Sequence, residues 1–216
     1  MALTLRHSGQ GAAGPAAASP TGVPDGAEAS REGPAVSAPA PAAGIVSFRD
    51  PSEGDEAVVR RAHVAHRQAT FATAGLPPET TIRLCEHQHD MQERQIAHHH
   101  PKAERRTILR GGVAVGRLCV DRSLAPWRIV DLVLVPEAQG HGVGRDALGQ
   151  LLDEATRAGA GVDLHVAGDN ARAEALYRRL GFAPDGDAGG PQRRMVWSPS
   201  GPPSGAGAGT GEDDDP

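Results

Sequence analysis

The sequence predicts an α/β fold in which helices flank a single mixed sheet. Short β-branched runs, such as residues 127–135, alternate along the chain with helical stripes, such as the one within residues 145–159. The order is strand, two helices, a run of strands, helix, strand, helix and strand, without an internal repeat. Neighbouring strands joined by a tight turn pair antiparallel, whereas parallel pairs need a longer crossover. We therefore expect both kinds of pairing in one sheet.

The first half of this pattern contains a short strand, two helices and a hairpin. Residues 45–50 are the predicted strand, and residues 56–71 and 80–97 have helical spacing. The second helix is the more polar, and its least polar side is expected to consist of Leu84, Gln88, Met91 and Gln95. Apolar and β-branched runs on both sides of Gly111-Gly112 are typical of a hairpin with a two-residue turn.

The second half begins with residues 127–135, a nearly continuous β-branched run that predicts a central strand covered on both faces. A glycine-rich turn leads into the helix of residues 145–159. Its apolar stripe is formed by Ala147, Leu148, Leu151, Leu152 and Ala155. Residues 162–166 are a further strand, Asn170 is the expected N-cap of the last helix, and residues 193–197 complete the sheet.

The two ends of the chain differ from the middle in composition and charge. Residues 1–44 are rich in Ala, Pro, Gly and Ser, and residues 199–216 add an acidic end, so we expect two disordered tails around one domain, residues 45–198. The tails hold 2 of the 22 Lys and Arg residues and 7 of the 27 Asp and Glu residues, which leaves 20 of each in the domain. A neutral, aromatic-poor domain predicts no nucleic-acid partner.

Membrane insertion and export are not expected either. No apolar run approaches the roughly 18 to 20 residues of a membrane span, and the N-terminal segment lacks the apolar stretch of a signal peptide. The two cysteines, Cys85 and Cys119, have no metal-ligand spacing. We expect them to be reduced and buried, in a cytoplasmic protein.

The glycine-rich turn is the first candidate binding site. Gly140, Gly142 and Gly144 lie where backbone N–H groups converge at a helix N-terminus, an arrangement that favours an anion. The alternative is a turn that only needs permissive backbone angles. A P-loop is excluded because Arg145 and Asp146 follow Gly144, and Arg145 also takes the place of the third glycine of a dinucleotide fingerprint.

The turn resembles the coenzyme A pyrophosphate loop of the GCN5-related N-acetyltransferase superfamily, whose Gln/Arg-x-x-Gly-x-Gly/Ala pattern is matched by Gln139, Gly142 and Gly144. A second block, Asn-x-x-Ala-x-x-Leu-Tyr-x-x-Leu-Gly-Phe, follows over residues 170–182. The resemblance covers residues 105–198 and implies a mostly antiparallel sheet with a splayed central parallel strand pair. Residues 45–104 match only the superfamily's variable strand and helix pair.

The resemblance also implies a co-substrate, acetyl-CoA, and its contacts. Pantetheine would pair with backbone groups of Val133, Leu134 and Val135. The remaining contacts would come from Gln139, Gly140, His141, Gly142, Val143, Gly144, Arg145 and Asn170. The same resemblance assigns Tyr177, the only tyrosine of the chain, as the acid that protonates the departing thiolate. A phenol with a pKa near 10 suits a thiolate whose conjugate acid has a pKa near 8.5.

Alternatives remain open for both candidate catalytic residues. Tyr177 could instead pack in the core beside Leu176 and Leu180. Asp131 lies within a buried strand, where an ionised carboxylate is costly unless it is paired. It could act through water as the base for an incoming ammonium, position the substrate, or form a salt bridge to Arg117 or Arg128.

The histidines are weaker candidates. His87, His89 and His98 to His100 contain no His-x-x-x-His pair, so no metal site is expected, and a solvated face or the lining of an acceptor pocket is the prediction. His63 and His66 share a face of the first helix and could line the same pocket or simply pack.

The sequence therefore predicts an acetyl-CoA-dependent N-acetyltransferase that acts on a primary amine of an unidentified small molecule or peptide, without a metal. A non-catalytic acyl-CoA-binding module of the same fold is the alternative. A third hypothesis is an interaction protein that recruits partners through its tails. A homodimer is left open.

Overall fold

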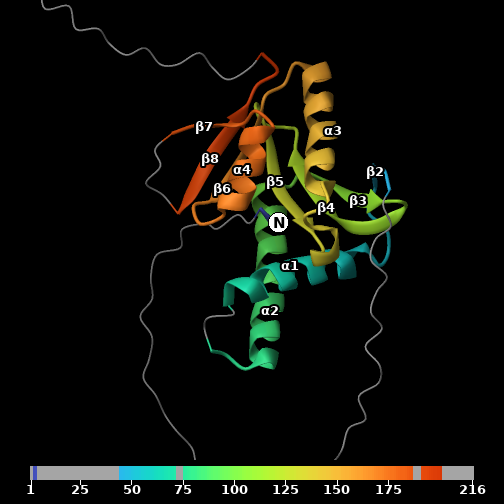
Figure 1. Ribbon diagram of the computed structural model, residues 1–216, viewed down its shortest axis with the longest axis vertical. Coiled ribbons are helices and arrows are strands. Elements are labelled where there is room, and N and C mark those ends of the chain that lie inside the picture. Colours follow the sequence, from blue (N-terminus) through green and yellow to red (C-terminus); the bar gives the residue numbers. More distant parts are fainter. Residues whose placement is uncertain (1, 4–43, 72–74, 187–190, 201–216) are drawn as a thin grey trace, which may run out of the picture.

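The structure is a computed structural model that describes residues 2–3, 44–71, 75–186 and 191–200. One sheet runs through it in the order β2-β3-β4-β5-β6-β8-β7, and β1 pairs with β5 outside this path. Figure 1 shows α3 and α4 in the upper half of the molecule and the crossed pair α1 and α2 in the lower half. Neighbouring strands are antiparallel except for β5 and β6, which confirms the predicted mixed sheet.

The two first helices are anchored by polar contacts. Helix α1 spans Asp55–Phe71, and the Asp55 carboxylate accepts hydrogen bonds from Arg49, Ser52 and Thr107, which tie the helix start to the sheet. Helix α2 spans Pro78–His99, with proline in its first turn, where the missing N–H costs nothing. It continues through His98 and His99, two residues beyond the predicted end.

The side of α2 that the sequence analysis selected lies one residue away from the side that is buried. The buried residues are Cys85, His89, Gln92 and Ile96, whereas Met91 is 42% exposed. Two of the four buried side chains are polar because this face lies against Asp131 of the sheet, to which Gln92 donates a hydrogen bond. A search for apolar spacing therefore selects the neighbouring stripe.

The remaining elements follow the predicted order. They are β1 Ala2–Leu3, β2 Val46–Arg49, β3 Glu104–Arg110, β4 Val113–Asp121, β5 Trp127–Leu134, the 3₁₀ turn Pro136–Ala138, α3 Val143–Ala158, β6 Val162–Ala167, α4 Ala171–Arg179, β7 Ala183–Pro184 and β8 Gln192–Trp197. Gly111 and Gly112 connect β3 to β4 as expected. The predicted stripe of α3 is buried in the main core, together with side chains of α1, α4 and the strands.

The central parallel pair opens toward its C-terminal ends. Strands β5 and β6 pair only over Trp127–Ile129 and Val162–Leu164. Just beyond, the register of β5 against β4 shifts at Val130, because Cys119 pairs with Asp131 and Val120 with Ile129. A bulge of this kind bends a strand and often lies next to an active site. The predicted splay is confirmed.

Strand β1 occupies the edge of β5 that the splay leaves open. Ala2 pairs with Val133 and Leu3 pairs with Leu132, in antiparallel orientation. The prediction of disordered tails did not anticipate this strand, and most of both tails lies outside the described residues.

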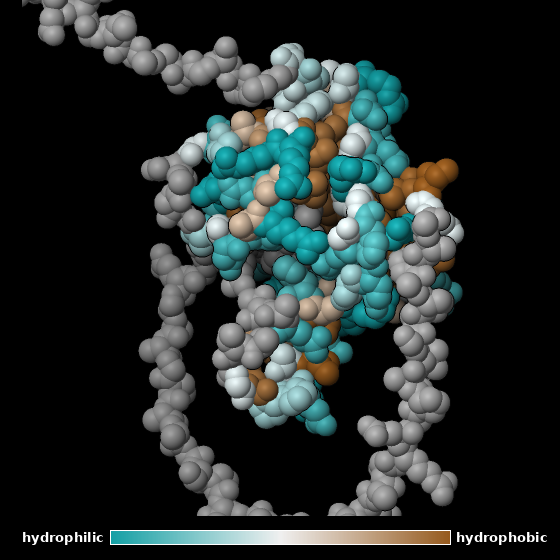
Figure 2. Space-filling view, in the orientation of Figure 1, coloured by the Kyte–Doolittle hydropathy of each residue, from teal (hydrophilic) through white to brown (hydrophobic). Residues whose placement is uncertain are grey.

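Other expectations can be compared directly. Cys85 and Cys119 are buried and free of disulfide bonds. Within the described ranges, no helix combines the length and apolar character that a membrane crossing needs. Figure 2 shows a mainly hydrophilic face on which apolar residues form only small groups.

Candidate functional site

The glycine turn lies between the end of β5 and the start of α3. Gly140 and Gly142 have φ values of 81° and 82°, a region that residues with a Cβ rarely adopt. Gly142 is the N-cap of α3 and offers no side-chain cap, so the first N–H groups of the helix are free to meet an anion. The requirement for permissive backbone angles and the proposed anion site therefore coincide in the same turn.

Three arginines meet at this turn. Arg145 of α3 and Arg172 and Arg179 of α4 line a cavity of about 320 Å³ together with Leu134, Gln139, Gly140, Gly142 and Leu176. Sequence reasoning missed Arg172 and Arg179. Their spacing of seven residues, two helical turns, places them on one face of α4, and this spacing could have indicated them. The cavity is cationic, as a phosphate site requires.

Three other predicted coenzyme contacts have structural partners of their own. The Gln139 side chain donates to the Leu134 carbonyl (2.9 Å), which holds the turn to the end of β5. His141 is exposed and its Nδ1 lies 2.8 Å from the Gln139 carbonyl. Asn170 accepts a hydrogen bond from the Ala173 N–H (3.1 Å), which confirms it as the N-cap of α4.

The environment of Tyr177 bears on both hypotheses, core packing and proton donation. Its ring is fully buried and packs edge-on against Phe182, with a centroid distance of 5.8 Å. Its hydroxyl, however, has no hydrogen-bond partner within the described part of the chain. Burial, and to a lesser extent the charge of Asp131, raise the pKa of the phenol, which therefore stays protonated. The ring fills the core, and the raised pKa makes the phenol a weaker acid than an exposed tyrosine.

Asp131 is fully buried and held by three side chains. Arg117 donates to it through Nη2 (2.7 Å), Gln92 donates through Nε2 (3.2 Å), and His63 Nε2 lies 3.3 Å away. Burial alone would raise the pKa of Asp131, but the charges of His63 and Arg117 hold it well below its usual range.

The salt bridge that the sequence left open is thus formed with Arg117. Arg128 pairs with Asp163 instead, at 2.6 Å.

A second cavity, of about 610 Å³, lies on the α1 and α2 side of the sheet. Its walls include Asp55, His89, Glu93, Arg105 and Arg117. Of the histidines predicted as pocket lining, only His89 reaches this cavity. His87, His98 and His99 are exposed, and His100 is bound to Asp121 (3.0 Å).

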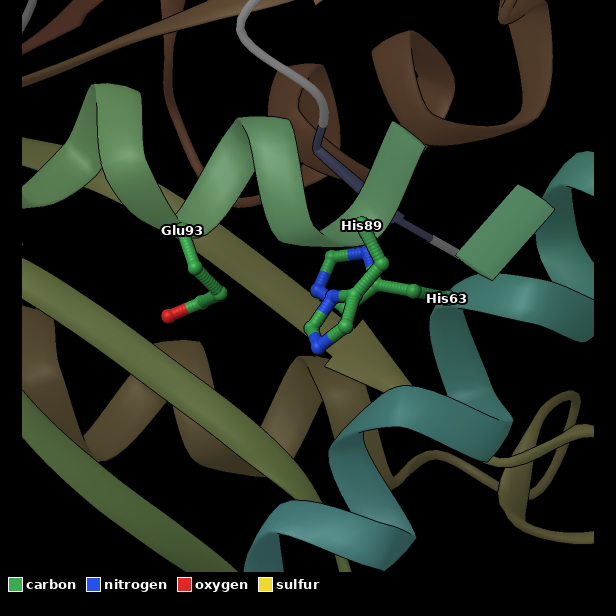
Figure 3. A group of neighbouring side chains, drawn as sticks. All are labelled: His63, His89 and Glu93. Atoms are coloured by element: carbon green, nitrogen blue, oxygen red, sulfur yellow. The ribbon is translucent and has the colours of Figure 1, made fainter. Parts of the chain in front are cut away.

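His63 does not line this cavity, but its ring packs against the ring of His89. Figure 3 shows His63 entering from α1 and His89 and Glu93 from one side of α2. The sequence did not predict that these three side chains meet.

Comparisons with solved structures agree with this architecture. A PaiA N-acetyltransferase from Thermoplasma acidophilum, solved in complex with coenzyme A, has a TM-score of 0.53 at 16% identity, over 71% of this chain and 99% of that one. An acetyltransferase from Thermus thermophilus has a TM-score of 0.51 at 21% identity, over 71% and 96%. RimJ from Mycobacterium smegmatis, in complex with CoA-disulfide, has a TM-score of 0.52 at 18% identity, over 73% and 84%. At these identities the likeness shows the fold.

Sequence comparison adds two findings. Over 61 residues the chain is 48% identical to a mycothiol acetyltransferase of Beutenbergia cavernae, a match that spans 28% of this chain and only 20% of that protein. The model of the acetyltransferase (GNAT) family matches residues 72–182, about half of the chain, including the glycine turn and Tyr177. The chain therefore belongs to the acetyltransferase (GNAT) family.

Proposed function

We propose that the protein is an acetyl-CoA-dependent N-acetyltransferase whose acceptor is a primary amine of a small molecule or peptide. The observation that carries the proposal is the cationic cavity at the glycine turn, which Arg145, Arg172 and Arg179 line together with Gly142, the N-cap of α3, and Leu134 at the end of β5. The pyrophosphate of coenzyme A suits this combination of arginines and free N–H groups. The similar proteins of T. acidophilum and M. smegmatis were solved with coenzyme A and CoA-disulfide.

Pantetheine would extend from this cavity along the open edge of β5, beside Val133 to Val135. This is the edge with which β1 pairs, since Val133 is the partner of Ala2. An extended chain and pantetheine compete there for the same backbone groups. Coenzyme binding in this position therefore requires β1 to leave β5.

The reaction needs an attack and a proton transfer. The nitrogen lone pair of the neutral amine attacks the thioester carbonyl carbon, the C–S bond breaks, and coenzyme A leaves as a thiolate. We assign Tyr177 as the donor that returns a proton to this sulfur, because its hydroxyl is protonated and without a partner in the described structure. A positioned acid of this kind contributes roughly 10²- to 10⁴-fold.

We do not assign Asp131 as the base that takes the proton directly from the amine. A carboxyl whose pKa is held so low is a weak proton acceptor at neutral pH. Its contacts with Arg117, Gln92 and His63 instead make it a fixed negative charge at the middle of β5. We propose that Asp131 positions the acceptor side of the site, and that the ammonium proton leaves to water.

The alternative, a non-catalytic acyl-CoA-binding module, is favoured by one observation. Tyr177, Asp131 and His63 are all fully buried, so an acceptor reaches none of them unless a covering segment moves. Measuring release of the coenzyme A thiol with a panel of amines separates the two functions. The panel contains a polyamine, an aminoglycoside and a peptide with a free N-terminus. Acetyl-CoA binding without thiol release for any amine would favour the binding module, whereas no binding at all would contradict both.

A further inference from the structure

The meeting point of α1 and α2 holds a group of three potential metal ligands. His63 comes from α1, and His89 and Glu93 come from α2, one helical turn apart on the same face. One ligand atom from each residue lies within 4.8 Å of the others. The two imidazole rings are stacked at a tilt of 31°, with centroids 4.9 Å apart (Figure 3).

The ring nitrogens of this group are buried without partners. His63 and His89 are both 0% exposed. Within the described residues, His63 Nδ1 and both nitrogens of His89 have no hydrogen-bond partner. Buried polar atoms nearly always have one, and exceptions call for an explanation such as a missing water or ion. An ion that takes up nitrogen lone pairs would satisfy these atoms together.

The geometry around His63 suits metal binding. Its Nε2 lies 3.3 Å from Asp131 Oδ2, so a proton on Nε2 points at that carboxylate and the unpartnered Nδ1 is the atom left for an ion. Histidines that bind metals commonly donate their other N–H to a carboxylate in this way.

The charges around the three residues predict that a cation binds there with moderate affinity. Glu93 and Asp131 carry two negative charges, and Arg117 contacts both, at 2.6 and 2.7 Å. Arg105 lies 3.9 Å from the other Glu93 oxygen. These guanidinium groups offset part of the carboxylate charge, and we therefore expect weaker binding than at a structural zinc site, whose thiolate ligands face no such competitors.

We propose that His63, His89 and Glu93 form a Zn²⁺ site, with Asp131 holding the His63 ring in place. Two imidazole nitrogens and one carboxylate oxygen are a donor set that Zn²⁺ takes with an open fourth position. Zinc–ligand bonds of about 2.0 to 2.2 Å require the ligand atoms to approach to roughly 3.5 Å. Glu93 is half-buried, and its carboxylate would shift away from Arg117, now at 2.6 Å, to close this gap. His89 and Glu93 line the larger cavity, from which an ion and a further ligand could enter.

This inference reverses the expectation of no metal site. That expectation considered spacing within one helix, and the ligands come from two helices that only the fold brings together. It does not depend on the proposed acetyltransferase activity, because the site contains no coenzyme contact.

The test uses the full chain without a histidine tag, treated with a chelator and free of acetyl-CoA. Zn²⁺ is titrated in competition with a chromophoric chelator, and Co²⁺ is added separately to look for visible absorption of a four-coordinate ion. We expect one Zn²⁺ per chain and a loss of at least tenfold in affinity in His63→Ala, His89→Ala and Glu93→Gln. We also expect a loss of about 10- to 100-fold in Asp131→Asn, which removes the partner of a ligand.

The matched control is His87→Ala, on the exposed face of the same helix, and His98→Ala controls for the exposed histidines at its end. Both should bind as the unchanged protein does. Circular dichroism of each metal-free variant checks the fold. If His63→Ala unfolds, Glu93→Gln gives the same readout from a half-buried position. Absence of Zn²⁺ binding, or equal binding by the unchanged protein, His89→Ala and Glu93→Gln, would overturn the proposal.

Discussion

Arg117 on β4 donates through one nitrogen to Asp131 on β5, two residues along that strand from its direct cross-strand partner Val133, at 2.7 Å, and the same nitrogen reaches Glu93 on α2. Asp131 is 0% exposed, and only 8% of the Arg117 side chain is exposed. The pair therefore joins the sheet to the helix that covers it. It also offsets the cost of burying the ionised Asp131 carboxylate.

We first predict that Arg117→Ala lowers the free energy of unfolding by about 3 to 5 kcal/mol, because it leaves a buried carboxylate without its cation. Urea unfolding at pH 7 measures this. Arg128→Ala is the control. Its partner Asp163 is just as buried but keeps Arg194 at 2.8 Å, so a smaller loss is expected. Equal losses of unfolding free energy in the two variants would contradict the larger contribution that we assign to the Arg117–Asp131 pair.

The second prediction concerns Tyr177→Phe. The ring and its contact with Phe182 are kept, and the lost hydroxyl has no partner in the described structure. The free energy of unfolding should therefore stay the same or rise slightly, while single-turnover acetyl transfer falls by about 10²- to 10⁴-fold. Tyr177→Ala, in contrast, should cost about 3 to 5 kcal/mol of stability. A wild-type single-turnover rate in Tyr177→Phe would remove this residue as the acid.

The third prediction concerns the cationic cavity. Arg172→Ala and Arg179→Ala should each weaken acetyl-CoA binding by about tenfold or more, since a hydrogen bond to a charged group contributes about 1.5 to 3 kcal/mol. Calorimetry measures the affinity. Arg157→Ala, at the exposed C-terminal end of α3, removes the same charge away from the cavity and should have little effect. If all three variants bind equally well, the phosphates lie elsewhere.

The fourth prediction is a pH dependence of stability. Burial lowers the pKa of His89 to about 4, below the value of about 6.5 in an unfolded chain. As the pH falls, His89 is therefore protonated in the unfolded chain before it is protonated in the folded one. The stability that depends on its neutral ring is complete above about pH 6.5 and is lost as the pH falls toward 4. Between pH 7 and pH 5 the loss from His89 should be about 2 kcal/mol, and His66, whose pKa burial also lowers to about 4, adds a loss in the same direction. Urea unfolding of the metal-free protein at both pH values should show this loss, and His89→Gln should lose correspondingly less. A slope as steep in His89→Gln as in His87→Gln would contradict the assignment.

The parts of the fold that depend on local pattern could be predicted from the sequence. The stripe of α3, the Asn170 cap and the Gly111-Gly112 hairpin are each encoded within a few neighbouring residues, and each is confirmed. The polar face of α2 could not be found this way, because Gln92 bonds to side chains of α1 and of the sheet and the His89 ring packs on His63 of α1.

The candidate site shows the same division. The glycine turn and Tyr177 lie in continuous motifs, and the sequence located both. Arg172 and Arg179 reach the turn from α4, and His63 meets Glu93 across two helices. Contacts of this kind depend on how the elements pack, and spacing along the chain carries no direct signal for them.

With the coenzyme in the proposed position, strand β1 would link residues 2–3 thermodynamically to coenzyme binding. Since Ala2 and pantetheine would use the same backbone groups of Val133, the apparent dissociation constant of acetyl-CoA equals its intrinsic value divided by the fraction of molecules in which β1 is detached. Whatever captures the first residues of the chain would raise that fraction and tighten coenzyme binding without touching the coenzyme site. By reciprocity, acetyl-CoA would release the N-terminus for such a partner.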